Sequence, residues 1–148
     1  MLSNPLNHKE KQAIFAGSFD PLHEGHLSII NKALKIFDHL FVVVTINPDK
    51  SDASDIEARF LSVKEQLSDF KNVTVIKNSN KLTAELAKEL NIKFLVRSAR
   101  NNLDLNYEMS LAAGNHQLNN DLETILFFPD YELIEYSSTL ERHKKFYK

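Results

Sequence analysis

Short apolar runs alternate along this chain with longer stretches in which apolar residues recur every three or four positions. The runs have the length of buried strands, whereas the recurring pattern is typical of amphipathic helices. We expect strands at 12–16, 40–46, 73–76, 93–96 and 123–128. Helices are expected at 24–37, from a capping box at 54–57 to about residue 70, at 81–90, at 104–118 and from near residue 138.

The strict alternation of strands and helices predicts the fold class. Strand, helix, strand units with right-handed crossovers produce a parallel sheet that is covered by helices on both faces. The continuous apolar run from Leu40 to Ile46 suits a strand that is buried on both sides. The sequence therefore predicts an α/β fold, a single-domain doubly wound five-stranded parallel sheet over residues 12–148, after an N-terminal extension at 1–11.

Composition and charge limit the classes of protein to which this chain can belong. With 148 residues, of which 43% are hydrophobic, the chain can bury one core, and it has no cysteine for disulfides or thiolate metal sites. The net charge of −2 argues against a broad nucleic-acid surface. No apolar run approaches the roughly 18 residues that span a bilayer, and the first residues lack the apolar core of a signal peptide. We expect a cytoplasmic protein without a nucleic-acid or membrane partner.

One polar run carries the first sign of chemistry. The sequence Gly-Ser-Phe-Asp-Pro-Leu-His-Glu-Gly-His, from Gly17 to His26, joins the first strand to the first helix. A glycine there lets the backbone turn and a ligand approach, and Gly25 would clear space at a helix N-terminus whose free N–H groups bind anions. An ordinary turn punctuated by Gly, Asp and Pro is the alternative. Because the pattern fixes residue types at about seven positions, we favour a phosphate site.

Other reactive side chains follow the remaining strands. Asn47–Lys50 comes after the second strand, Arg97–Arg100 after the fourth, and Ser137–Arg142 at the start of the last helix. Each segment alone could be a solvated loop or a routine helix start. Ligands of doubly wound sheets bind at the carboxyl ends of the strands, so the joint placement of these segments predicts one site.

These motifs resemble a known family. The run from Gly17 to His26 is similar to the signature of the nucleotidyltransferases that carry the H-x-G-H motif. The segment Arg97-x-x-Arg100-Asn101, with Tyr107-Glu108 and other residues after it, resembles bacterial phosphopantetheine adenylyltransferase, and the similarity extends from about residue 11 to about residue 142. The resemblance implies a Rossmann-like nucleotidyltransferase fold. It also implies transfer of the adenylyl group of ATP to 4′-phosphopantetheine, giving dephospho-coenzyme A and pyrophosphate in coenzyme A biosynthesis.

The resemblance also implies roles for individual residues. Attack of a phosphate oxygen on the α-phosphorus of ATP depends on positioning and charge stabilisation and needs no covalent nucleophile. His26 would donate a hydrogen bond to the reacting phosphate, and the catalytic set would be His26, Ser18, Lys50 and Arg97. The phosphopantetheine site would comprise Ser18, Lys50, Thr83 and Arg97. The ATP site would comprise Gly17, Ser18, Phe19, His26, Ser98, Ala99, Arg100, Glu108, Ser137, Ser138 and Thr139. Mg²⁺ would be carried by the ATP phosphates, without a metal cage built by the protein.

Other functions share parts of these motifs. Nicotinate mononucleotide adenylyltransferases resemble the chain at His23-x-Gly25-His26 and at Ser137–Arg142, but they lack the segment that begins at Arg97. A glycerol-phosphate cytidylyltransferase shares H-x-G-H, but the segments that begin at Arg97 and Ser137 fit it less well. A nucleotide-binding sensor without catalysis is a further alternative.

The expected oligomeric state and a few residues that differ from the family pattern also bear on the resemblance. Members of the family are commonly hexamers, so a homo-oligomer is expected, although this chain stops soon after Arg142 without the family's further C-terminal helix. Ser98 stands where the family has glycine, and Leu133 where it often has an aromatic residue near the adenine.

Overall fold

The computed structural model describes residues 10–46 and 55–130; residues 1–9, 47–54 and 131–148 lie outside the described part. Within it, strands and helices alternate as the sequence predicts, whereas the helix expected near residue 138 lies outside. In chain order the elements are β1 (Gln12–Gly17), α1 (Glu24–Ala33), β2 (His39–Thr45), α2 (Ile56–Gln66), β3 (Val73–Asn78), α3 (Thr83–Leu90), β4 (Phe94–Ser98), α4 (Asn102–Leu118) and β5 (Glu123–Phe127).

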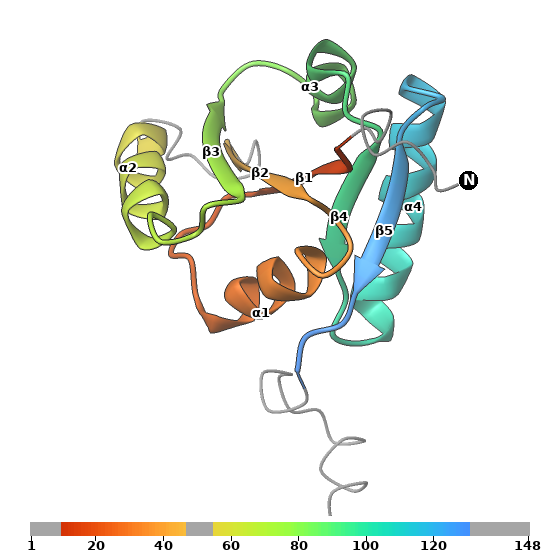
Figure 1. Ribbon diagram of the computed structural model, residues 1–148. Coiled ribbons are helices and arrows are strands. Elements are labelled where there is room, and N and C mark those ends of the chain that lie inside the picture. Colours follow the sequence, from red (N-terminus) through yellow and green to blue (C-terminus); the bar gives the residue numbers. More distant parts are fainter. Residues whose placement is uncertain (1–9, 47–54, 131–148) are drawn as a thin grey trace, which may run out of the picture.

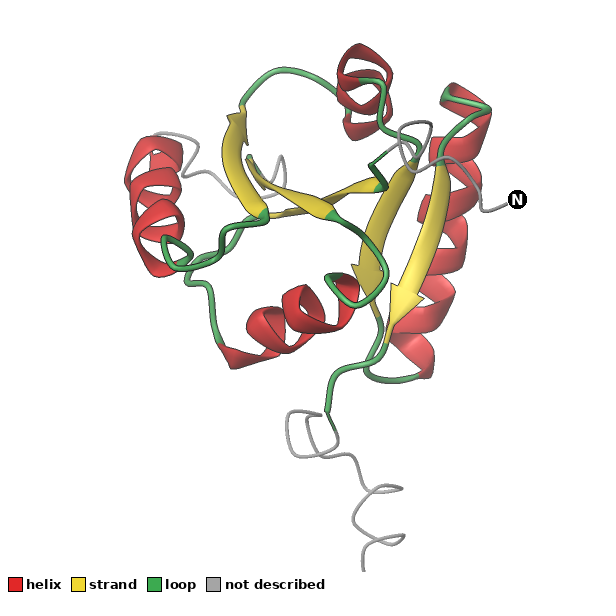
Figure 2. Cartoon of the chain, in the orientation of Figure 1, coloured by secondary structure: helices red, strands yellow, loops and turns green. Residues whose placement is uncertain are grey.

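The five strands form one parallel sheet in the order β3-β2-β1-β4-β5, which confirms the predicted α/β fold. Helices lie on both faces, with α1 and α2 on one and α3 and α4 on the other (Figures 1 and 2). The chain runs outward from β1 to β3 and then returns to the other side of β1 with β4. This reversal makes the carboxyl ends of β1 and β4 the expected place for a ligand.

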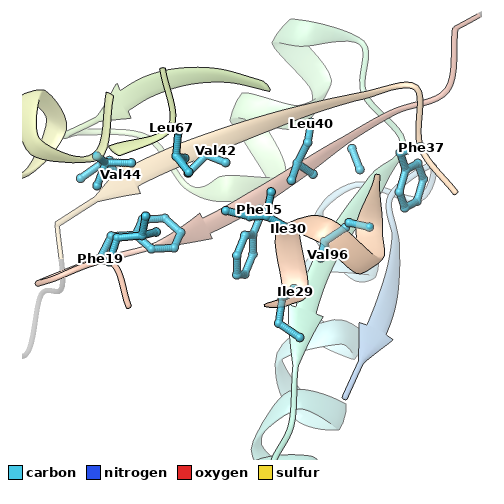
Figure 3. Packing of buried hydrophobic residues seen from close by; sticks show 14 residues of the cluster. Phe15, Phe19, Ile29, Ile30, Phe37, Leu40, Val42, Val44, Leu67 and Val96 are labelled. Carbon is cyan, nitrogen blue, oxygen red and sulfur yellow. The ribbon is translucent and has the colours of Figure 1, made fainter. Parts of the chain in front are cut away.

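Each central strand contributes to two cores because its side chains alternate between the faces of the sheet. Phe15 of β1 and Val42 of β2 pack with α1 and α2 in the larger cluster, part of which Figure 3 shows. Ile14 and Val43, one position before or after them, pack on the other face with α3. All four side chains are at most 4% exposed. Burial on both faces explains why these strands read as continuous apolar runs.

Helix α1 ends earlier than the expected boundary at residue 37. Its last residue is Ala33, and the amides of Lys35 and Ile36 bond to carbonyls three residues back, which tightens the chain into a turn. Phe37 lies beyond the helix but is buried, with its ring centroid 5.4 Å from that of Phe94. The apolar spacing therefore predicted the burial of Phe37 correctly, but the helix end that it predicted is wrong.

Two other boundaries differ from the expected ones in ways that matter for the site. Arg97 and Ser98 are the last two residues of β4 and do not belong to the loop that follows it. Helix α4 begins at Asn102, before the expected residue 104, because the Asn101 side chain accepts a hydrogen bond from the Asp104 amide at 2.9 Å. The Ser54 cap predicted for α2 lies outside the described residues, and the side chain of Asp55, the residue before α2, makes no capping bond.

Candidate active site

The loop after β1 turns at Phe19, whose φ of 47° lies in the left-handed region. Neither Gly17 nor Gly25 has a positive φ, so the expectation that a glycine provides the turn is wrong. Gly17 instead leaves space for an aromatic ring, because a Cβ there would lie 3.2 Å from the Phe19 ring. Phe19 is buried, and its ring packs edge-on against Phe15 with centroids 5.3 Å apart (Figure 3).

The two histidines of the motif cap the start of α1 through reciprocal hydrogen bonds. The Gly25 amide donates to Nδ1 of His23 at 3.0 Å, and the His23 amide donates to Nδ1 of His26 at 3.1 Å. The two rings stack with centroids 3.8 Å apart. The Gly25 N–H is therefore bound to the His23 ring and is not free for an anion. A side chain at residue 25 would collide with the His23 ring, because its Cβ would lie 2.8 Å from a ring carbon.

His26 is held as a neutral ring with its proton on Nε2. Burial, together with a smaller electrostatic effect of the neighbouring His23, lowers the pKa of His26 to about 4. Because Nδ1 accepts the hydrogen bond from the His23 amide, the proton of the neutral ring belongs on Nε2. The ring also packs edge-on against Phe19, with centroids 4.9 Å apart. At neutral pH this side chain can donate one hydrogen bond and carries no charge.

A cavity of about 630 Å³ opens beside His26, at the reversal point between β1 and β4. We call it the His26 cavity. Its walls come from the start of α1, the end of β4 and the loop after it, the first turns of α4, and the second residue after β5. The lining residues are His23, Glu24, Gly25, His26, Ser98, Arg100, Asp104, Tyr107, Glu108 and Pro129.

A second cavity of about 510 Å³ lies at the carboxyl ends of β1, β2 and β3, and we call it the Thr83 cavity. Arg97 and Thr83, both predicted to bind phosphopantetheine, line it together with Gly17. The buried Asn78 side chain shapes the adjoining loop, since it bonds both the amide and the carbonyl of Lys81.

An ion pair lies between the two cavities. Arg97, which lines the Thr83 cavity, donates from Nε and Nη2 to the two carboxylate oxygens of Glu108, each at 2.8 Å. Glu108 lines the His26 cavity, and its side chain is only 6% exposed. Nη1 of Arg97 donates to the Ala16 carbonyl at 3.1 Å. The guanidinium is therefore oriented by three hydrogen bonds at the end of the sheet.

Arg100 is also held by a carboxylate, because its Nε and its amide donate to Asp104 at 3.0 and 3.1 Å. Ala99 between these arginines is buried at 1% exposure, so it presents almost no surface to a ligand. Within residues 10–46 and 55–130, no three His, Asp or Glu side chains lie close enough to hold a metal ion. No helix in the same ranges is long and apolar enough to cross a membrane.

Comparisons with known proteins show the family to which the chain belongs. Residues 14–144 match the cytidylyltransferase-like family. The phosphopantetheine adenylyltransferase of Mycoplasma mycoides subsp. mycoides SC is 44% identical over 138 residues, covering 93% of this chain and 99% of that protein. The one from Streptococcus uberis is 36% identical over 143 residues, covering 89% of this chain and 86% of that protein. The chain belongs to the phosphopantetheine adenylyltransferase family.

Solved structures with lower identity bear on the fold of this family member. The lipopolysaccharide core biosynthesis protein from Thermoplasma volcanium GSS1 has a TM-score of 0.57 and 18% identity, over 87% of this chain and all of that chain. A bifunctional NMN adenylyltransferase/ADP ribose pyrophosphatase from Francisella tularensis has a TM-score of 0.58 and 17% identity, over 94% of this chain and 42% of that chain. These likenesses support the Rossmann-like nucleotidyltransferase fold predicted from the sequence.

The structure brings most of the site residues predicted from the family resemblance to one edge of the sheet. His26, Ser98, Arg100 and Glu108 line one cavity, and Thr83 and Arg97 line the other, with Ser18 in the loop between β1 and α1. Lys50, Ser137, Ser138 and Thr139 lie outside the described residues, as does Leu133.

Two cations to which sequence reasoning gave no role organise this edge. Arg59 of α2 donates to the Ser18 and Thr45 carbonyls, and Lys32 of α1 donates to the Phe128 carbonyl at 2.5 Å. Lys32 also pairs with Asp130 at 3.1 Å, and this hydrogen-bonded partner lowers the pKa of the Asp130 carboxyl. Both residues lie on helices, where charged side chains are usually solvated, and their acceptors are distant backbone carbonyls that no sequence pattern records.

Proposed function

We propose that this chain transfers the adenylyl group of ATP to 4′-phosphopantetheine at the carboxyl edge of β1 and β4. An oxygen of the phosphopantetheine phosphate attacks the α-phosphorus of ATP and forms the new P–O bond. The bond from that phosphorus to the oxygen bridging to the β-phosphate breaks, and pyrophosphate leaves with its electron pair. The observation that carries the proposal is a neutral, oriented His26 beside a cavity at the reversal point of the sheet.

His26 would act as a hydrogen-bond donor. Negative charge accumulates on the phosphoryl oxygens as the reaction proceeds, and fixed donors stabilise that charge without reorganising. A ring with Nε2–H and a pKa of about 4 keeps its proton and stays neutral throughout. The stack with His23 and the contact with Phe19 hold the ring in place before ATP binds. The start of α1, where the helix dipole is positive, favours the same anion.

The ion pair between Arg97 and Glu108 would separate the two substrates. The His26 cavity would take the nucleotide, since Ser98 and Arg100 line it, and the Thr83 cavity would take the pantetheine arm. Arg97 would then face the phosphate of phosphopantetheine, with Lys50 as the second cation predicted from the sequence. Glu108 contacts Arg97 directly, so its role in this arrangement is to orient the guanidinium as well as to line the nucleotide cavity.

Mg²⁺ would enter with the triphosphate, where it neutralises charge on the departing pyrophosphate. The carboxylates near this cavity fit an ion that is bound mainly by the nucleotide and not by a cage of protein ligands. Of the three carboxylates that line the His26 cavity, Asp104 is hydrogen-bonded to Arg100 and Glu108 is paired with Arg97, while the third, Glu24, is the first residue of α1.

Self-association is supported by the outer face of α4. Leu103 and Leu118 are 80% and 57% exposed, and their spacing places them near one face of the helix. Two charged substitutions, Leu103→Glu and Leu118→Glu, should therefore shift the chain toward monomer in light scattering, and an unchanged mass would contradict a homo-oligomer built on this face. The hexamer and the cytoplasmic location stay predictions from the sequence.

The reaction is tested by comparing acceptors. With purified protein, ATP and Mg²⁺, pyrophosphate release should depend on added 4′-phosphopantetheine, and nicotinate mononucleotide should not replace it. Lys50→Ala and Arg97→Ala should raise the KM for phosphopantetheine more than that for ATP, because a phosphate monoester loses its paired cations. Equal turnover with nicotinate mononucleotide would point to the other adenylyltransferase family, and no turnover with either acceptor would contradict the proposal.

A further inference from the structure

Arg59 bridges two chain segments at the edge of the sheet where the cavities lie. Its Nη1 atom donates to the Ser18 carbonyl at 2.6 Å and to the Thr45 carbonyl at 2.9 Å. Ser18 belongs to the loop after β1, and Thr45 is the last residue of β2. The two hydrogens of one guanidinium nitrogen therefore tie the ends of two neighbouring strands to α2.

Both carbonyls matter for the proposed reaction. Ser18 is predicted to contact the phosphates of both substrates, and the chain beyond Thr45 leads within five residues to Lys50. A carbonyl at a strand end has lost its ladder partner, so a side-chain donor is needed to satisfy it when water is excluded. Arg59 supplies that donor to both segments at once, and it thereby fixes their separation.

The bond to Ser18 also determines how the following peptide is turned. A trans peptide points its carbonyl and its N–H in opposite directions, so holding the Ser18 carbonyl toward Arg59 turns the Phe19 N–H away from it. Phe19 has a φ of 47°, a left-handed conformation that is strained in a residue other than glycine and persists only when its surroundings enforce it. Arg59 is one such constraint, and the ring packing of Phe19 against Phe15 and His26 is another.

We propose that Arg59 is a positioning residue for adenylyl transfer, holding the Ser18 loop and the end of β2 at a fixed spacing. Arg59 is absent from the described residues that line either cavity, so it acts through the backbone that it holds. It is half-buried, and its two acceptors are neutral carbonyls, which leaves the phosphates to other cations. The expected loss of turnover without Arg59 rests on the proposed function. The expected loosening of the backbone that Arg59 holds does not.

The kinetic test compares Arg59→Gln and Arg59→Lys with Lys64→Gln. Lys64 lies on the same helix and is exposed, so its variant is a matched loss of one cation. Arg59→Gln should lower kcat on the order of 10- to 100-fold, because displacements near 1 Å at a reacting centre cost about that much. The KM values should change less, Arg59→Lys should recover part of the rate, and Lys64→Gln should match the wild type. A lower melting temperature with unchanged kcat, or a raised KM for ATP with normal kcat, would overturn the proposal.

A measurement without substrate separates this proposal from the proposed function. Amide hydrogen exchange of peptides covering residues 16–22 should be faster in Arg59→Gln than in the wild type and in Lys64→Gln, whereas peptides from α4 should be unchanged. Unchanged exchange in residues 16–22 would overturn the positioning role. If exchange rises as expected but the wild-type chain transfers no adenylyl group to phosphopantetheine, the proposed function fails and the backbone role of Arg59 stands.

Discussion

The Glu108 carboxylate accepts two hydrogen bonds from the Arg97 guanidinium, with Nε and Nη2 each 2.8 Å from an oxygen. Glu108 is the buried residue of α4, a helix whose other described side chains are half-buried or exposed. The pair therefore anchors this helix to the end of β4 and orients a cation before any substrate binds. Preorganisation of this kind is what charge stabilisation at a transferring phosphoryl group requires.

Arg97→Ala should destabilise the fold as well as impair the reaction. It leaves the buried Glu108 carboxylate without its partner, and removing one member of a buried pair costs about 3 kcal/mol or more. Urea unfolding monitored by circular dichroism measures this change. The double variant Arg97→Met/Glu108→Met should recover much of the stability without recovering activity. An Arg97→Ala protein as stable as the wild type would show that the ion pair has no structural role.

Gly25→Ala should disrupt the start of α1, because its Cβ would lie 2.8 Å from the His23 ring. Moving that ring breaks its bond to the residue 25 amide and disturbs the stack on His26, so we expect a loss of about 1 kcal/mol and a lower kcat. Gly114→Ala is the control, since a Cβ there meets nothing within 4 Å and alanine favours the α4 helix by roughly 0.5–1 kcal/mol. Equal stability and turnover in the two variants would contradict the packing argument.

The protonation state of His26 can be observed directly by nitrogen NMR of the imidazole rings. With a pKa of about 4 and Nδ1 accepting from the His23 amide, His26 should give the signal of a neutral ring protonated on Nε2 between pH 5 and pH 8. His26→Ala should lower kcat by on the order of 100-fold or more, by analogy with the loss of one oxyanion donor. A ring that takes up its proton near pH 6.5 would contradict the neutral-donor role.

Burial of His26 also predicts how stability depends on pH. Its pKa in the folded chain is about 4, below the ordinary value of 6.5, so in this window the unfolded chain binds a proton that the folded chain does not. The unfolding free energy should therefore fall as pH is lowered from about 6.5 toward 4. In His26→Asn this contribution disappears, and urea midpoints should fall less steeply over the same range. Parallel slopes in the two proteins would show that His26 is not responsible.

Much of the fold follows from local sequence patterns, and the exceptions have physical causes. Alternation of apolar runs predicted the sheet because residues such as Val42 and Val43 must be buried on opposite faces. The same pattern placed the end of α1 too late, since a buried Phe37 fits a tight turn as well as a helix. Spacing alone cannot distinguish the two.

The site was predictable where the residues of the run from Gly17 to His26 themselves form it. His26 and Gly25 lie at the helix start that the sequence indicated, but the space beside Gly25 holds the His23 ring in place of an anion. The role of Arg59 was hidden because its acceptors are backbone carbonyls 41 and 14 residues away, which no side-chain pattern records. Long-range backbone contacts of this kind become visible only once the strands are aligned.

Adenylyl transfer can be followed directly through the α-phosphorus of ATP. When the chain is incubated with ATP labelled at that atom, Mg²⁺ and 4′-phosphopantetheine, we predict that the label appears in dephospho-coenzyme A in a one-to-one ratio with released pyrophosphate. His26→Ala should give the same product far more slowly. Label recovered as free AMP, or product formed only when nicotinate mononucleotide replaces phosphopantetheine, would contradict the central claim.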